Sequence, residues 1–155
     1  MVEIVPYDSN NDYEKVKELM EELTKFWGQS FNVEQFNASL SRRTNDPVNK
    51  EGILLAKEGN EVLGMIWCEV VFQPSIGTYG RISNFVVRKE ARGKGIGKKL
   101  IESAIKFFVE NNVSRVQANA RNLDKEGRLY SKYGFKPLYF VLETKLDMEY
   151  FTKSY

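Results

Sequence analysis

A loop rich in glycine and basic residues lies between a predicted strand and a predicted helix in the second half of the chain. The loop contains Arg92-Gly93-Lys94-Gly95-Ile96-Gly97, and the segment from Arg88 to Lys99 holds six basic residues and one acidic residue. A helix N-terminus presents unpaired backbone N–H groups, and glycines let an anion approach them closely. The pattern therefore predicts an α/β fold with an anion site at this junction. The alternative is a flexible loop whose glycines only permit tight packing.

Two well-known glycine motifs do not fit this loop. A P-loop has the pattern G-x-x-x-x-G-K-[ST], but Arg92 stands where its first glycine would be and Lys99 where its Ser or Thr would be. A dinucleotide fingerprint, G-x-G-x-x-G, fails whether it is counted from Gly93 or from Gly95. The spacing therefore excludes both of these nucleotide-binding motifs.

Hydrophobic periodicity and turn residues place the other elements around the loop. Three strands in sequence precede the main helix, so the order predicts a mixed α/β sheet and not a doubly wound parallel one. A chain of 155 residues predicts one domain, residues 1–155. The expected strands are 2–5, 53–57, 62–72, 82–87, 113–120 and one or two within 135–146; the expected helices are 12–27, 33–40, 96–110 and 124–133, with a loop over 73–80.

Composition excludes several classes of protein. Apolar residues make up 42% and charged residues 28% of the chain, with 10 Phe, 8 Tyr and 2 Trp, which is typical of a globular protein and not of a disordered one. No apolar window is long enough for a membrane span, and no signal peptide is visible, so we expect a cytoplasmic protein. A net charge of +2 argues against a nucleic-acid partner.

The chain has one cysteine and no histidine. An internal disulfide, a Ser-His-Asp triad, a Cys-His pair and a histidine metal site are therefore impossible. Cys68 lies in an apolar run and is expected to be a small core residue and not a nucleophile. We expect no metal cofactor.

Two motifs in order resemble the GNAT superfamily of acetyl-CoA-dependent N-acetyltransferases. The loop from Arg92 to Gly97 matches the family's R/Q-x-x-G-x-G/A motif, and the strand 82–87 looks like the strand that precedes it. Downstream, Leu129-Tyr130-Ser131-Lys132-Tyr133-Gly134-Phe135 is similar to the family's L-Y-x-x-x-G-F motif. The resemblance covers roughly residues 54–146. It implies a single-domain N-acyltransferase fold, with helices on both faces of the sheet and a V-shaped splay between the fourth and fifth strands.

The resemblance also implies how acetyl-CoA is held. The backbone N–H groups of the glycine loop would bind the pyrophosphate, and the end of the preceding strand would pair with the pantetheine arm. Asn122 resembles a further cofactor contact, but it lies one residue farther from Tyr130 than is usual, so Leu123 or an ordinary turn role stays open. The implied cofactor-binding residues are Phe85, Val86, Val87, Arg92, Gly93, Lys94, Gly95, Ile96, Gly97, Lys98 and Asn122.

Tyr130 matches the family's general acid. A tyrosine, with a pKa of about 10, can donate a proton to a leaving thiolate, whose thiol has a pKa of about 8.5. The alternative is a ring packed in the core with a local hydrogen bond. The general base is left open between Glu69 and a water polarised by Ser83 or Asn84.

The resemblance therefore implies direct acetyl transfer from acetyl-CoA to a primary amine. The acceptor is a protein N-terminus, a lysine or a small-molecule amine, and a homodimer is left open. Residues 26–44 and 73–80, which the resemblance assigns to the acceptor pocket, hold no strong acidic cluster, so a polycationic acceptor is not favoured. Two rival functions are a non-catalytic acyl-CoA sensor and a basic nucleic-acid-binding module.

Overall fold

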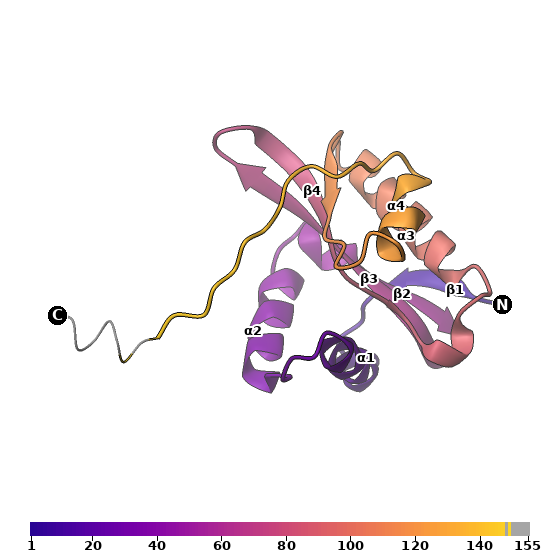
Figure 1. Cartoon of the computed structure of the whole chain (residues 1–155). Helices are drawn as coiled ribbons and strands as arrows, with labels where there is room; N and C mark the ends of the chain where they lie inside the picture. The colour runs from indigo at the N-terminus through magenta and orange to yellow at the C-terminus, as the bar shows by residue number, and fades with distance from the viewer. Residues whose placement is uncertain (148, 150–155) are drawn as a thin grey trace. The chain divides into compact units, whose positions relative to one another are not determined.

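The computed structural model describes residues 1–147 and 149. Residues 1–119 form one compact unit and residues 120–155 another. The prediction that both belong to a single domain over residues 1–155 stays a prediction. In chain order the elements are β1 (Glu3–Pro6), α1 (Tyr13–Phe26), α2 (Val33–Thr44), η1 (Asn49–Gly52), β2 (Ile53–Glu58), β3 (Glu61–Gln73), β4 (Gly77–Val87), η2 (Lys89–Ala91), α3 (Ile96–Glu110), β5 (Val116–Ala118) and α4 (Glu126–Ser131) (Figure 1).

The first unit is built on a five-stranded sheet in which the strands lie in chain order, β1 to β5. The first four strands pair antiparallel, as in the register Leu55↔Met65 and Glu69↔Arg81. β4 and β5 pair parallel, because α3 lies between them in the chain and returns it in the same direction. The predicted mixed α/β sheet is confirmed.

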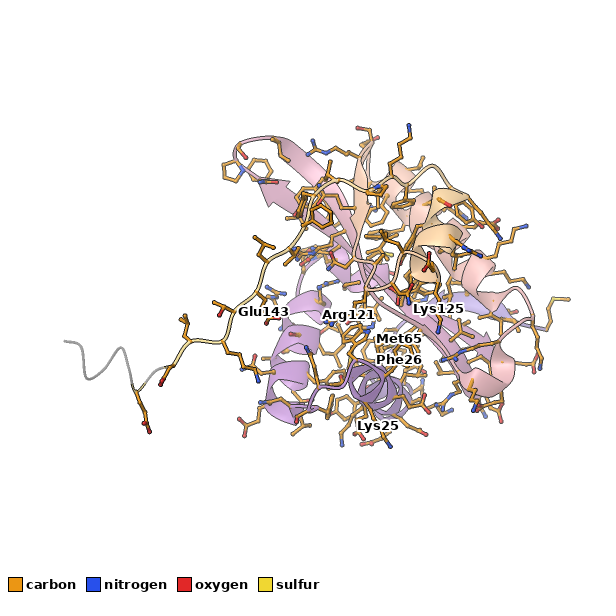
Figure 2. The ribbon with its side chains drawn as sticks, in the orientation of Figure 1. Lys25, Phe26, Met65, Arg121, Lys125 and Glu143 are labelled. Carbon is orange, nitrogen blue, oxygen red and sulfur yellow. The ribbon has the colours of Figure 1, made fainter. Side chains whose placement is uncertain are left out.

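Helices cover both faces of this sheet, as predicted (Figure 1). α1 and α2 bury their apolar stripes on one face, in a cluster with Met65 and Trp67, and Figure 2 shows Met65 on the side where α1 lies. α3 covers the other face, where a Cβ on Gly80 would come within 2.5 Å of the Phe108 ring. The buried helix residues on the first face are Val16, Leu19, Met20, Leu23, Phe36 and Leu40.

The β3–β4 hairpin is longer than the sequence predicted. Residues 73–80 were expected to form a loop, but Gln73 already pairs with Gly77, and the ladder continues to Val87. The turn is only three residues long and is closed by Gly77, whose φ of +87° favours glycine. The predicted loop is therefore right only for residues 74–76.

The fourth and fifth strands part after a short contact, which is the predicted splay. Their pairing runs only from Gly80↔Val116 to Ile82↔Ala118, so β5 has three residues where strand 113–120 was expected. β4 continues for five residues, and a bulge there sets Met65 opposite Val86 but Trp67 opposite Ser83. Asn84, inside the bulge, has a φ of +48°. Within the described residues, no strand lies beside this half of β4 on its β5 edge.

The second unit contains α4, and residues 135–147 after it form neither helix nor strand. The one or two closing strands expected within 135–146 are therefore wrong for this structure. The large apolar side chains between residues 138 and 146 are exposed, and those of Phe140 and Leu142 are each 91% accessible. A strand needs a hydrogen-bonded neighbour, and a favourable local sequence cannot supply one.

Across the described residues, no helix combines the length and the apolar character needed to cross a membrane.

Candidate functional site

The glycine loop adopts a backbone that requires glycine at two positions. Gly93 and Gly95 have φ values of +78° and +79°, in the left-handed region that residues with a Cβ rarely adopt. A Cβ at either position would meet nothing within 4 Å, so the space over the loop is open. Gly97, in contrast, lies within the first turn of α3. The loop is thus shaped by its glycines and leaves its backbone accessible.

The loop leads into the N-terminus of α3, which no side chain caps. Gly95 is the N-cap residue, and the first helical backbone bond runs from the Lys99 N–H to the Gly95 carbonyl at 3.1 Å. The N–H groups of the three residues before Lys99 have no partner within the helix. The first turn also lacks an acidic residue, while the side chains of Lys98 and Lys99 are exposed. This arrangement is a ready anion site at the positive end of a 15-residue helix.

Arg92 and Ile96 contribute to this region in different ways. The Arg92 Nε donates to the Val87 carbonyl at 3.0 Å, which ties the loop to the end of β4. Ile96 is only 2% exposed, so its side chain anchors α3 in the core and only its backbone can face a ligand. Lys94 is exposed on the loop.

Arg88 supports the loop, although the sequence showed it only as one of six clustered cations. Its backbone N–H donates to the Leu63 carbonyl at 2.8 Å, and its Nε donates to the Val62 carbonyl at 2.7 Å. A guanidinium nitrogen also lies 3.6 Å from the Glu18 carboxylate on α1. Arg88 therefore fixes the start of the loop to β3 and α1.

Three half-buried residues, Phe85, Val86 and Val87, lie on the part of β4 where no strand of the described residues pairs on the β5 side. On the other side, Val86 and Val87 pair with Met65 and Gly64. This backbone is already extended and held in register, and an extended strand edge can accept another extended chain. The structure thus brings together the strand end and the glycine loop predicted from the sequence.

Two predicted site residues lie in the second unit. Tyr130, on α4, is 5% exposed, and its ring packs at 5.2 Å from that of Phe135. Asn122 is exposed, and its side-chain oxygen accepts the Asp124 N–H at 2.8 Å, while its carbonyl accepts the Gly127 N–H. That geometry is a turn at the start of α4 and supports the turn interpretation of Asn122. The cofactor contact of Asn122 stays a prediction.

Glu69 lies on β3 between two arginines. Its Oε2 is 3.4 Å from the Nε of Arg43, and its Oε1 accepts a hydrogen bond from Arg81. Both arginines escaped the sequence analysis. The hairpin register sets Glu69 opposite Arg81, so a longer predicted hairpin would have revealed one of them.

Comparison with known proteins identifies the family. The Acetyltransferase (GNAT) family profile matches residues 16–135, which includes the glycine loop and α4. This chain belongs to the GNAT acetyltransferase family. Members of this family are acetyltransferases that use acetyl-CoA.

Individual relatives agree with that assignment. An uncharacterized N-acetyltransferase of Archaeoglobus fulgidus is 32% identical over 68 residues, a stretch that spans 41% of this chain and 45% of that protein. A GCN5-related N-acetyltransferase from Ralstonia eutropha JMP134 superposes with a TM-score of 0.78 at 22% identity, covering 94% of this chain and 99% of the other. A predicted acetyltransferase from Clostridium acetobutylicum, solved with acetyl-CoA, has a TM-score of 0.74 at 20% identity, covering 94% and 96%. The two structures show that this GNAT chain shares their fold.

Proposed function

We propose that this GNAT protein transfers an acetyl group from acetyl-CoA directly to a primary amine. One observation carries the proposal: the left-handed Gly93 and Gly95 lead into the uncapped N-terminus of α3, beside the open edge of β4. An anion site next to an extended strand edge suits a ligand with a phosphate group and an amide-bearing arm. The acceptor class, a cytoplasmic location and a homodimer stay predictions.

The loop residues fit the pyrophosphate of acetyl-CoA. The backbone N–H groups from Arg92 to Lys98 would hold it, since Gly93, Gly95 and Gly97 place no side chain in the way. The exposed side chains of Lys94 and Lys98 would add charge-assisted contacts. The edge of β4 from Phe85 to Val87 would pair with the amides of the pantetheine arm.

Acetyl-CoA supplies the acetyl group as a thioester, and the chain supplies proton transfer. Tyr130 would donate its phenolic proton to the leaving sulfur. For the base, a water held by Ser83 or Asn84 is favoured over Glu69, because guanidinium groups already occupy both Glu69 carboxylate oxygens. Cys68 is fully buried, which supports direct transfer without an acetylated cysteine.

The Gly95→Val variant tests the phosphate site. A β-branched side chain disfavours the left-handed φ and would fill the space over the loop, so we expect acetyl-CoA affinity to fall about 10- to 100-fold, the scale of a lost charge-assisted hydrogen bond. Calorimetric titration with acetyl-CoA measures this change. Gly59→Val is the matched control, because Gly59 has a φ of +61° and equally open space but lies in the β2–β3 turn.

The control variant should lose similar stability and keep its affinity for acetyl-CoA. Equal affinities of Gly95→Val and Gly59→Val for acetyl-CoA would contradict the assignment of the pyrophosphate to the glycine loop. Acetyl-CoA-dependent thiol release with a panel of primary amines then separates a transferase from a non-catalytic acyl-CoA sensor, because a sensor would release no thiol with any amine.

A further inference from the structure

Positive charge gathers on the sheet face that α2 covers, next to the point where β4 and β5 part. The register sets Glu69, Arg81 and Gln117 side by side on β3, β4 and β5, and side chains in one such row share a face of the sheet. Arg43 of α2 contacts Glu69 from above this face. Tyr79 lies two residues before Arg81 and therefore on the same face, and the Arg115 guanidinium is 5.8 Å from the centre of the Tyr79 ring.

Two arginines share the single carboxylate in this group, and Arg43 is the more deeply buried of the two. Arg43 is 6% exposed, donates to the Cys68 carbonyl at 3.2 Å and lies 5.6 Å from the centre of the Trp67 ring. Burial lowers the pKa of Arg43, and the nearby Glu69 opposes that shift. One carboxylate faces two guanidinium groups, so one positive charge of the three residues remains unbalanced, and Arg115 adds another.

Arg81 is also accessible. Its side chain is 40% exposed, whereas that of Glu69 is 12% exposed. One terminal nitrogen of Arg81 donates to Glu69. A guanidinium has five N–H donors in a rigid fork, so this hydrogen bond does not use all of them. Glu69 thus fixes the guanidinium from the buried side, which is how a positioning residue prepares an arginine for a ligand.

The location links this cation to the acceptor and not to the phosphates. Arg81 lies two residues before Ser83, where β4 leaves β5, whereas the glycine loop begins beyond the other end of that open edge. An anion on Arg81 would therefore lie at the opposite end of the open edge from the phosphate site. A planar carboxylate matches the guanidinium fork with two parallel hydrogen bonds.

We propose that Arg81 binds a carboxylate of the acceptor, so that the substrate class is a small molecule carrying both a primary amine and a carboxylate. This inference rests on the proposed acetyl transfer. Arg115 adds long-range attraction for the anion, and Glu69 acts as a positioning residue for Arg81.

The test compares each amino acid with its own amide as acceptor. Glycine, β-alanine and 4-aminobutyrate, each paired with its amide, vary the distance between amine and carboxylate. For each pair, kcat/KM for the acid is divided by kcat/KM for the amide. This ratio in a variant is then divided by the ratio in the wild type, because the intrinsic reactivity of each amine cancels in the quotient. Arg81→Gln retains a donor for Glu69 and removes the charge, and we expect this quotient to fall about 10- to 100-fold.

Two further variants sharpen the comparison. Arg81→Lys keeps the charge but loses the fork, so its ratio should fall between those of the wild type and Arg81→Gln. Lys106→Gln is the control for loss of one surface charge, because Lys106 is an exposed cation on α3, which covers the other face of the sheet. Its ratio should equal that of the wild type.

A folded Arg81→Gln variant with an unchanged ratio would overturn the carboxylate site, and so would an equal loss for acids and amides, which indicates a purely structural arginine. Calorimetric binding of the same acids and amides to the protein saturated with CoA gives the comparison without turnover. Arg81-dependent binding of acids without any thiol release would overturn the acetyl transfer and leave the carboxylate site standing. Turnover with an acid-to-amide ratio that does not change in the Arg81 variants would overturn the carboxylate site and leave the acetyl transfer standing.

Discussion

Cys68 shows how one residue's surroundings distinguish two routes of acetyl transfer. It is the only cysteine of the chain, and its side chain is fully buried in β3. Burial raises its pKa to about 12, and the neighbouring Arg43 offsets this only in part. At pH 8 about one such thiol in ten thousand would be ionised, and the thiolate is the nucleophilic form. The residue is therefore suited to packing and not to carrying an acetyl group.

We expect Cys68 to resist thiol reagents in the folded protein. A disulfide reagent monitored by absorbance should react only when denaturant unfolds the chain, because both access and ionisation are lacking in the native state. The Cys68→Ala variant should keep its kcat within about twofold while losing about 1 kcal/mol of stability. Rapid native labelling, or a loss of turnover in a stable Cys68→Ala variant, would point to an acetylated cysteine instead.

At the scale of elements, the β3–β4 hairpin shows why local sequence misjudged a strand. Proline, serine and two glycines made residues 73–80 look like a loop, yet only residues 74–76 turn. Gly80 lies inside β4. A glycine stands at this position because the ring of Phe108, on α3, occupies the space that a side chain would need. That neighbour is distant in the sequence, so the glycine could not be distinguished from a turn residue. The same error hid Arg81, which belongs to the extended part of the strand.

The contact between Gly80 and Phe108 can be tested as a pair. Gly80→Ala would place a methyl group about 2.5 Å from a ring that is 1% exposed, so the strand or the ring must move. We expect a loss of about 1–3 kcal/mol in the free energy of unfolding, measured by denaturant titration. Phe108→Leu alone should destabilise the protein by leaving a cavity, but it should reduce the cost of Gly80→Ala. Strictly additive losses in the double variant would show that the two residues do not compete for space.

For the whole molecule, the sequence predicted the first unit far better than the second. The helices over 12–27 and 96–110 and the glycine loop were predictable because periodicity and turn residues are local signals. α3 matches its predicted bounds, Ile96–Glu110. The sequence of residues 135–146 predicts one or two strands, but strand formation depends on a partner edge that the sequence does not specify. The pair of Glu69 and the buried Arg43 was likewise beyond prediction, because only the packing of α2 on the sheet brings the two together.

The Tyr130→Phe variant tests the proposed general acid. The variant keeps the ring that packs on Phe135 and removes the phenolic hydroxyl group with its proton. If Tyr130 protonates the leaving thiolate, kcat should fall about 10- to 10³-fold, the scale of a general-acid contribution. Acetyl-CoA affinity should change little, because the loop and the β4 edge that we assign to the cofactor belong to residues 1–119. Steady-state kinetics and direct acetyl-CoA titration of the same preparation measure both quantities, with Tyr133→Phe, the other tyrosine of the motif, as the matched control. A wild-type kcat in Tyr130→Phe, under conditions where the chemical step limits turnover, would leave Tyr130 as a packing residue, since phenylalanine fills the same space.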